Sequence, residues 1–598
     1  MSKAAAKAQI KVPEAAKPAA VPHPIGSVLT IEVALYAVIL VGGAALRLVK
    51  LDAAPLSTQE AQQALAAFRG ATLPAGGSPL LYSVNQLLFG LFGSSVGDAG
   101  VRLGPALIGA LLMLVPWLFR GVLGRYGALA ASALLAISPV VTAASRTLDG
   151  QIVTVTFALA AIGFARRFAE TRAARHAYAA AVSAGLCLAG GPGTVTILIG
   201  IGVGGLIGWR PALSEKERIQ WAALRGESIA WRHALIVGVA ALIGAASTLL
   251  LNPVAVRHLP ESISAWLAAW GGFDTIGVLQ ALQTLALYEP LIVLTAVAGL
   301  VMTLRRPTLA TVLLGVWGIG ALLVMLLQPG RQMFDLALAL TPLALLGGRA
   351  VQTLCEALQA HGRRQLEGAM LLIIVPLIGY LLMTASGYAA GRGLSNAQVF
   401  GQTFTPLASF AVLTALLTLI VGSVFTLAIG VGPALRAGLL ALLALLSVIA
   451  LGNTWGATQL RASDPREPLW GPTASTADVR AVVQAVEAAS LRATGHSRRA
   501  VINVVGPQAD PLLAWYLCDF ANARFAAIDD GAAAVVITSE GGAQPIGPGG
   551  YIGARFDLRS TWSPIGLSDI SGLRWWLYRT ANEPPVTESV IVWVRPAE

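Results

Sequence analysis

The feature of this sequence that most constrains its fold is a succession of long apolar runs. Runs of roughly 17 to 25 apolar residues, long enough for a helix to cross a bilayer, recur about thirteen times between residues 28 and 452. With 56% hydrophobic and 12% charged residues, the 598-residue chain is too apolar for an ordinary soluble protein. The sequence therefore predicts a mainly α-helical, polytopic membrane protein of about 13 transmembrane helices.

Positive charge alternates from loop to loop between these runs. Every second loop is rich in arginine, as in residues 166–175 and 210–232, whereas the intervening loops carry at most one basic residue per short connection. Because basic residues gather on the cytoplasmic side, this pattern predicts a cytoplasmic N-terminus and an extracytoplasmic C-terminus, in the plasma membrane. The formal net charge of +11 then reflects topology, and no nucleic acid partner is expected.

The composition divides the chain into three parts. Residues 1–27, rich in Ala, Lys and Pro, are expected to form a disordered basic cytoplasmic tail. Residues 28–452 form the membrane body, with a large external loop at residues 50–100. Within this loop, Ser57–Arg69 and Pro79–Phe92 are expected to be helices, the second lying in the membrane interface. Paired interfacial helices beside a span suggest a lateral opening for a lipid-bearing ligand.

After Gly452 the long apolar runs stop, and residues 453–598 are predicted to form a small extracytoplasmic α/β domain. Asp478–Arg492 has the pattern of an amphipathic helix. Ala500–Val505 and Ala533–Thr538 are expected to be buried strands, with a helix at Pro511–Asn522 between them. The loop after the first strand holds only one glycine, so it carries no dinucleotide or phosphate fingerprint.

Two acidic residues, Glu60 and Asp149, fall in external loops beside a span. A carboxylate at the edge of a low-dielectric body is costly unless it is paired or used, and it could act as a general base toward a hydroxyl. Each residue also has a structural interpretation. Ser57 and Glu60 form the S-x-x-E pattern of a capping box, and Asp149 directly precedes a span, where an Asp N-cap is expected. The two interpretations are compatible, because a capped helix end also fixes a carboxylate in place.

Arg146 and Arg331 are lone cations in external loops, where the positive-inside rule gives them no role. Together they could bind an anionic group such as a phosphate, or each could pair with a carboxylate or a lipid headgroup. Glu289, at the start of a later span, is either an N-cap-region acid or a residue of the same external cavity.

Several classes of function are excluded. The six histidines are scattered, so no metal site is predicted, and the sequence gives no support for a divalent metal or another cofactor. There is no Walker loop, which argues against ATP-driven transport. Charged residues are nearly absent from the spans, which argues against an ion-coupled carrier.

The order of these motifs resembles the GT-C glycosyltransferases, and within them the branch of protein O-mannosyltransferases and lipid A aminoarabinose transferases. The matching stretches are PLSTQEAQQA in the first external loop, SPLLY at Ser78–Tyr82, Ser138–Asp149, YEP at Tyr288–Pro290 and GRQMFDLALALTP at Gly330–Pro342.

This resemblance implies a polyprenyl-phosphate sugar donor bound from the membrane and transfer to a protein, lipid or glycan acceptor on the external face. It implies that the acid of the first loop is a base or positions the acceptor and that basic residues hold the donor phosphate. It also adds Tyr82 to the substrate-binding candidates.

The first loop departs from the family pattern, because Gln59 stands where the family usually has Asp, and an amide is not a base at neutral pH. Either Glu60 or Asp149 takes this role, or the chain is a catalytically silent relative. A silent relative would serve as a structural or lipid-binding subunit of a membrane complex, or as an accessory for flipping a lipid-linked sugar.

Overall fold

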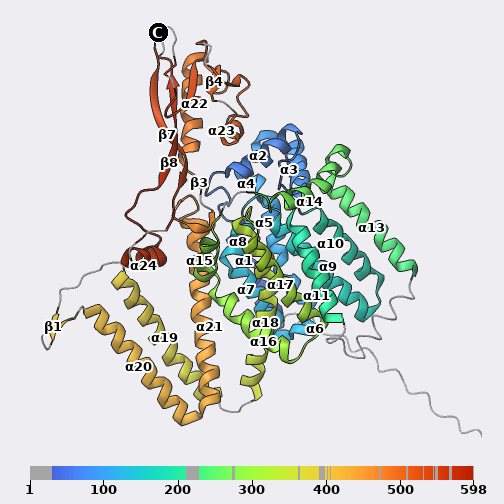
Figure 1. Cartoon of the computed structure of the whole chain (residues 1–598), viewed down its shortest axis with the longest axis vertical. Coiled ribbons are helices and arrows are strands. Elements are labelled where there is room, and N and C mark those ends of the chain that lie inside the picture. The colour runs from blue at the N-terminus through green and yellow to red at the C-terminus, as the bar shows by residue number, and fades with distance from the viewer. Residues whose placement is uncertain are drawn as a thin grey trace, which may run out of the picture.

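A computed structural model describes residues 30–209, 228–272, 276–360, 364–389, 397–399, 402–404, 406–470, 473–506, 509–528, 531–542, 544–545, 550–564, 567 and 569–596. It shows a large helical body with a smaller, sheet-containing domain standing on one end of it (Figure 1). The predicted fold, a mainly helical membrane protein with a C-terminal α/β domain, is confirmed. The predicted tail, residues 1–27, lies outside the described residues.

The first half of the body runs from one long helix through the first loop to a series of longer helices. Its elements are α1 (Ile31–Leu48), α2 (Thr58–Arg69), α3 (Pro79–Phe92), η2 (Gly93–Val96), α4 (Gly97–Val101), α5 (Leu103–Leu112), η3 (Val115–Phe119), α6 (Arg120–Leu123), α7 (Arg125–Ile137), α8 (Pro139–Ser145), α9 (Gln151–Thr171), α10 (Ala174–Leu188), α11 (Gly193–Trp209) and α13 (Ser228–Ala246). The predicted helices of the external loop are confirmed as α2 and α3.

The second half of the body ends in the long helix that leads to the C-terminal domain. Its elements are η4 (Pro253–Arg257), α14 (His258–Ala268), α15 (Val278–Tyr288), α16 (Pro290–Arg305), α17 (Leu309–Leu327), η5 (Met333–Asp335), α18 (Leu336–Ala360), α19 (Arg364–Ala389), β1 (Ala397–Val399), β2 (Gln402–Phe404), α20 (Pro406–Ile429), α21 (Val431–Trp455), η6 (Gly456–Leu460) and η7 (Pro468–Trp470). Helices α19 and α20 form a hairpin that leans away from the rest of the body (Figure 1).

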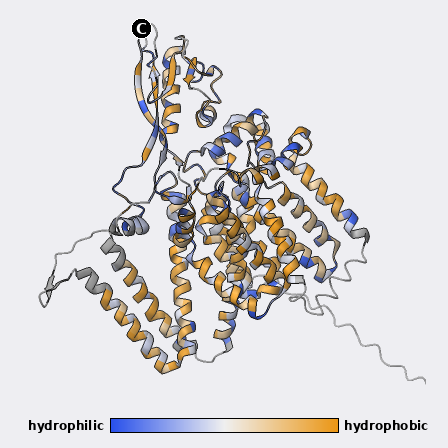
Figure 2. Ribbon diagram, viewed as in Figure 1, coloured by the Kyte–Doolittle hydropathy of each residue, from blue (hydrophilic) through white to orange (hydrophobic). Residues whose placement is uncertain are grey.

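Eight helices in the described ranges are long and apolar enough to cross a membrane, or up to ten when each bent helix pair counts as one span. Hydrophobic residues cover these helices along most of their length (Figure 2). The chain is therefore a multi-pass membrane protein. The predicted count of thirteen is not confirmed, because several apolar helices, such as α11, are shorter than a full span.

Two spans are broken at prolines, and the residues at the two breaks are in contact. The chain bends by 64° between α7 and α8 and by 90° between α15 and α16. Pro139 and Pro290 each lack a backbone N–H and disfavour helical geometry in the residue before them. Glu289, before the second proline, accepts hydrogen bonds from Ser138 Oγ (2.6 Å) and Val140 N (2.9 Å), so its carboxylate caps the helix that begins at the first break.

The carbonyl groups freed at the end of α7 are satisfied by Arg47. Its guanidinium donates to Leu135 O (2.9 Å) and Ala136 O (3.2 Å), and the side chain is fully buried. A helix end leaves its last carbonyls without intrahelical partners, and a buried end needs other donors. Arg47, which has no carboxylate partner among the described residues, is thus accommodated in the body because it stabilises the broken span.

The C-terminal domain is built on a six-stranded mixed sheet with the order β3-β7-β8-β6-β4-β5. Its elements are β3 (Thr473–Ser475), α22 (Asp478–Thr494), β4 (Ile502–Val505), α23 (Pro511–Tyr516), β5 (Ala523–Ala526), β6 (Val535–Ser539), β7 (Ile552–Thr561), α24 (Asp569–Tyr578) and β8 (Val586–Val594). The two predicted buried strands are present as β4 and β6, and they pair in parallel. The predicted helix to Asn522 is too long, because α23 ends at Tyr516 and a short strand, β5, follows.

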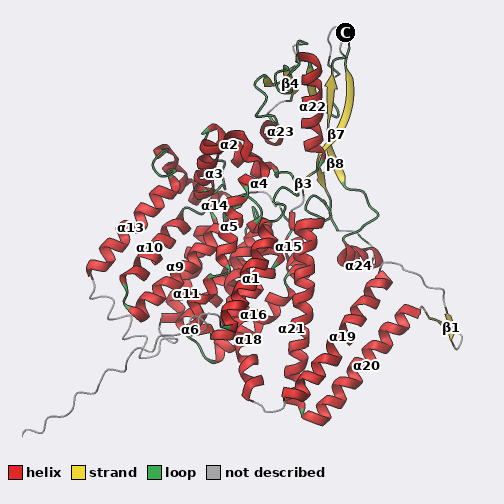
Figure 3. Ribbon diagram, turned by 180° about the vertical axis from the view of Figure 1, so that it is seen from behind, coloured by secondary structure: helices red, strands yellow, loops and turns green. Residues whose placement is uncertain are grey.

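The two longest strands, β7 and β8, were absent from the sequence prediction. They pair antiparallel and form a ribbon that reaches from the body to the far end of the domain (Figure 3). Strand β7 has mostly half-buried or exposed residues, including Gly553 and Arg555, so it lacks the short buried run by which β4 and β6 were found.

The domain is held on the body through Asp98, the acid in α4. This carboxylate accepts hydrogen bonds from Arg480 Nη2 (2.7 Å), Tyr516 Oη (2.7 Å) and Trp515 Nε1 (3.2 Å), all from the domain. Tyr516 Oη in turn accepts from Leu56 N (3.0 Å), just before α2. The domain is therefore fixed directly over the first external loop.

Candidate functional site

A cavity of about 360 Å³ lies where the loops predicted to be external meet the C-terminal domain. Its wall is formed by the start of α2 with the segment before it, by the loop between α8 and α9, by the segment before η5, and by the linker to the domain with β3 and β7. Of the candidate site residues, Glu60, Arg146, Asp149 and Arg331 line this cavity, and Tyr82 and Glu289 do not.

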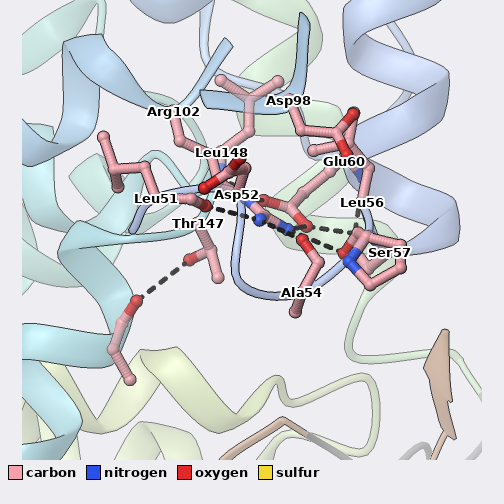
Figure 4. A network of polar contacts seen from close by, with 12 residues as sticks. Leu51, Asp52, Ala54, Leu56, Ser57, Glu60, Asp98, Arg102, Thr147 and Leu148 are labelled. Atoms are coloured by element: carbon pink, nitrogen blue, oxygen red, sulfur yellow. Dashed lines mark hydrogen bonds and ion pairs between the residues drawn. The ribbon is translucent and has the colours of Figure 1, made fainter. Parts of the chain in front are cut away.

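Glu60 is held by four hydrogen bonds at the base of this cavity. Arg102 donates from Nε to Oε1 and from Nη2 to Oε2, both at 2.8 Å, and the side chains of the pair are only 5% and 6% exposed. The backbone N–H groups of Ser57 (2.8 Å) and Leu148 (3.0 Å) also donate to the carboxylate. Figure 4 shows these contacts joining the first and second external loops.

These contacts settle the local role of Glu60. The capping box predicted for Ser57 and Glu60 is present, with both reciprocal hydrogen bonds. Burial alone would raise the pKa of Glu60, but the Arg102 guanidinium and the donated hydrogen bonds outweigh it and lower the pKa below the usual range. A carboxylate with this many donors is a weak base, so Glu60 is suited to fixing the loops in place.

Asp149 has the opposite surroundings. Its Oδ1 accepts one hydrogen bond, from Gln151 N (2.8 Å), and the described residues offer no donor to Oδ2. Burial raises the pKa of Asp149 to about 6; the Gln151 N–H opposes this shift, and the nearby Glu60 carboxylate adds to it. The residue before α9 is Gly150, so Asp149 caps the helix from one position further out than predicted. Asp149 is the carboxylate of the cavity best suited to accept a proton.

Gln151 links Asp149 to a third carboxylate, Asp335. Gln151 Nε2 donates to Asp335 Oδ1 (2.6 Å), and Asp335 Oδ2 accepts from Gln332 N (2.7 Å) at the start of η5. This connection ties the second external loop to the segment that carries Arg331. Sequence reasoning missed Asp335 although it lies within the quoted motif GRQMFDLALALTP, and an acid at a membrane edge was the signal that singled out Glu60 and Asp149.

The two predicted phosphate-binding arginines are occupied by backbone carbonyls. Arg146 donates to Arg47 O (3.0 Å) at the end of α1 and to Val49 O (2.8 Å) and Lys50 O (2.6 Å) just after it. Arg331 Nε donates to Met325 O (3.0 Å) near the end of α17. Burial, together with the Arg102 charge, lowers the pKa of Arg146 to about 10, so it stays protonated at neutral pH. Both residues therefore bring fixed positive charge to the cavity wall.

Tyr82 and Glu289 are structural by their placement. Tyr82 is buried, donates to Ala71 O (2.7 Å) and packs edge-on against His258. Glu289 caps the start of α8, as described above. Neither side chain is brought to the cavity with the other candidates.

Three further residues of the cavity were not found from the sequence. Arg102 is a lone cation at the external end of a span, which is the signal used for Arg146 and Arg331, and it was overlooked. Arg559 and Trp470 come from the C-terminal domain and its linker. Arg559 bonds to Thr58 Oγ1 (2.9 Å) at the start of α2 and to Asp510 Oδ2 (2.7 Å), so only the docked domain brings it to the site.

Within the described ranges, no group of three or more His, Cys, Asp or Glu side chains is arranged to hold a metal ion. The expectation that the protein needs no metal or other cofactor stays a prediction.

Comparison with known proteins gives one family match. Residues 77–201 match the model of the dolichyl-phosphate-mannose-protein mannosyltransferase family. This stretch contains Arg146 and Asp149 and begins after Glu60. The chain thus resembles GT-C glycosyltransferases of the protein O-mannosyltransferase and aminoarabinose transferase type, as the motifs predicted. No curated protein matches the chain.

Similar solved structures are distant relatives in sequence. ArnT from Cupriavidus metallidurans, bound to undecaprenyl phosphate, is 14% identical, with a TM-score of 0.48, over 86% of this chain and 94% of that one. The Archaeoglobus fulgidus oligosaccharyltransferase is 12% identical, with a TM-score of 0.44, over 84% and 65%. The arabinosyltransferase EmbB from Mycobacterium smegmatis is 18% identical, with a TM-score of 0.39, over 75% and 44%.

Proposed function

We propose that this membrane protein transfers a sugar from a polyprenyl-phosphate donor to an acceptor hydroxyl on the extracytoplasmic face of the plasma membrane. The family matched over residues 77–201 is named for a lipid-phosphate sugar donor. The observation that carries the proposal is the cavity in which Asp149, with a free carboxylate oxygen, lies among buried arginines. This arrangement also favours an enzyme over a silent relative. Although residue 59 is Gln and not an acid, Asp149 is still available as a base.

The charge of the cavity suits a phosphate. The cavity is lined by four arginines, Arg102, Arg146, Arg331 and Arg559, and by two acids, Glu60 and Asp149. The charge of Glu60 is neutralised by Arg102. In a site of low dielectric, such preorganised charge stabilises negative charge that develops on a leaving group. The donor phosphate is therefore expected on the side of Arg146 and Arg331.

The reaction follows from these roles. Asp149 Oδ2 removes the proton of the acceptor hydroxyl as its oxygen attacks the anomeric carbon of the donor sugar. The bond between that carbon and the phosphate oxygen breaks, and its electron pair leaves with the polyprenyl phosphate. Attack from the side opposite the leaving group inverts the anomeric carbon. The proton stays on Asp149 until water removes it.

The test uses the full chain in lipid nanodiscs, with labelled polyprenyl-phosphate hexose and cell-envelope extract as the source of acceptor. The wild type is expected to give labelled product, and Asp149→Asn is expected to lose at least about a hundredfold in rate, the scale of a lost general base. Asp52→Asn is a matched control, because Asp52 is an exposed carboxylate of the first external loop that does not line the cavity.

Normal transfer by a folded Asp149→Asn protein would refute the assignment of the base. Absence of transfer and of donor binding by the wild-type protein would refute the proposed function itself.

A further inference from the structure

A groove separate from the cavity lies at the other end of α2. It has a volume of about 560 Å³, and its walls are the last turn of α2, one side of α3 and the turn that follows α13. This volume is in the range of small-molecule pockets, about 300–1,000 Å³. Helix α2 has 12 residues and rises about 1.5 Å per residue, so the groove lies roughly 17 Å from the end of α2 that contacts the Asp149 loop.

The turn after α13 has an unusual backbone. Thr248, Leu249 and Leu250 are all in the left-handed region, with φ of 54°, 55° and 70°. This conformation is unfavourable for residues other than glycine, so three in a row persist only where their surroundings hold them. Thr248 N donates to Ser83 Oγ (3.2 Å) and Thr248 Oγ1 donates to Gln86 Oε1 (2.7 Å), both on α3. The polar groups of the turn are thereby held against the protein.

The leucines of this turn point away from the protein. Leu249, Leu250 and Leu251 are 68%, 68% and 75% exposed, and Leu91 of α3 is 75% exposed. Leu91 and Leu251 both line the groove. A large exposed apolar patch marks contact with a membrane or a partner. Because the chain is a multi-pass membrane protein and the turn directly follows the apolar helix α13, the groove is expected to open toward lipid.

Arg69 supplies positive charge at one edge of the groove. The side chain is exposed, takes part in no ion pair within the described ranges, and is the one charged side chain among the described residues that line the groove. Its charge complements the carbonyl end of α2, which is a structural role. That role leaves the guanidinium able to donate to an anion.

The inner wall of the groove is aromatic. Phe68 and Phe89 line it and meet edge-on, with ring centroids 5.3 Å apart. The groove thus combines one cation with an apolar wall, which matches a phosphate group joined to a hydrocarbon chain. Since no acid lines it within the described ranges, a lipid with a net negative charge is favoured over a zwitterionic one.

We propose that this groove binds an anionic phospholipid of the bilayer, with the phosphate on Arg69 and the upper part of an acyl chain along Phe89 and Leu251. Polyprenyl phosphate offers the same two groups. However, a phosphate on Arg69 would lie at the wrong end of α2 for sugar transfer at Asp149. The groove is therefore assigned to a lipid that is bound and not consumed.

The test uses the full chain in phosphatidylcholine nanodiscs that contain phosphatidylglycerol with a photoreactive acyl chain. After illumination, peptide mapping measures the crosslinks to α3 and to the turn at residues 247–252. Competition by unlabelled lipids then gives an apparent Kd for each of them. No sugar donor takes part, so the result is independent of the proposed transfer reaction. Unlabelled phosphatidylglycerol is expected to compete at least about fivefold better than either phosphatidylcholine or polyprenyl phosphate, the scale of one basic residue at a charged lipid surface.

The two informative variants are Arg69→Gln and Leu91→Asp. Each changes an exposed side chain that lines the groove, so folding is preserved. The first removes the cation, and the second places a negative charge on the apolar wall. Each is expected to weaken phosphatidylglycerol binding about fivefold.

Arg492→Gln is the matched control. Arg492 is also an exposed arginine in the last turn of a helix, α22, and it does not line the groove. Crosslinking in this variant should equal that of the wild type.

Wild-type affinity in either Arg69→Gln or Leu91→Asp would overturn the site. Equal competition by phosphatidylcholine would overturn the choice of an anionic lipid. Stronger competition by polyprenyl phosphate would overturn the phospholipid assignment and give the groove to the carrier lipid.

Discussion

Arg102 and Glu60 form a bidentate ion pair, with two hydrogen bonds of 2.8 Å, between the start of α5 and the first turn of α2. Arg102 also donates to the carbonyls of Leu51, Ala54 and Pro55, so one guanidinium organises the whole segment that enters α2. The floor of the cavity therefore depends on this pair.

Glu60→Gln is expected to destabilise the protein by roughly 3–5 kcal/mol, because it leaves the buried Arg102 charge without a counter-ion. Thermal unfolding in detergent measures this effect. The double variant Glu60→Gln with Arg102→Met removes both charges and should be more stable than the single variant. A single variant that unfolds at the wild-type temperature would contradict the structural role of Glu60.

Transfer should depend on pH through Asp149. Because its pKa is raised to about 6, the rate should rise with pH up to a midpoint near 6 and then level off. The effect on stability has the opposite sign. The folded state holds the proton more tightly than the unfolded state, so this group weakens folding as pH rises from about 4 to about 6. Rate profiles and unfolding curves between pH 4 and 8 measure both effects. In Asp149→Asn, the contribution of Asp149 to the pH dependence of stability should be absent. A rate midpoint near 4 would contradict the assignment.

Gln59→Asp tests whether the departure from the family pattern disables the enzyme. Gln59 is exposed, lines the cavity and lies in the first turn of α2, where a carboxylate is favoured by the helix dipole by about 0.3–1 kcal/mol. The new charge should shift the pH midpoint of transfer upward by roughly half a unit through repulsion of Asp149, with little change in rate at pH 8. A large gain of activity would instead identify position 59 as the missing base.

Tyr516→Phe should loosen the C-terminal domain. The substitution removes a donor to Asp98 and the acceptor for Leu56 N, and should cost about 1–3 kcal/mol. Faster proteolytic release of the domain and weaker transfer are expected together, because Arg559 and Trp470 reach the cavity only from the docked domain and its linker. Tyr551→Phe, in a tyrosine that bonds within the domain to Ala533 O, is the control. Unchanged proteolysis in Tyr516→Phe would show that other contacts hold the domain.

The sequence predicted the membrane body and the helices of the first loop because their signals are local. Apolar length and the S-x-x-E pattern can each be recognised within one short stretch of sequence. The partners of Arg146 and Arg331, and those of Glu60 other than Ser57, could not be predicted, because each is a backbone group or a charge brought close only by tertiary packing. The ribbon of β7 and β8 was missed for the same reason, since its stability comes from pairing with distant strands and much of it is exposed.

Two buried arginines of the body donate to carbonyls at the ends of helices, Arg47 at the end of α7 and Arg146 at the end of α1. Such a charge is part of the framework and does not swing away once the phosphate bond has broken. For the proposed reaction, the donor is a phosphodiester with one negative charge, whereas the released lipid is a monoester that approaches two near neutral pH. A permanently positive wall binds the released monoester more strongly than the donor phosphodiester. Turnover would then be limited by departure of the spent carrier, and adding polyprenyl phosphate would inhibit the enzyme at concentrations at which the sugar-bearing lipid has not yet saturated it.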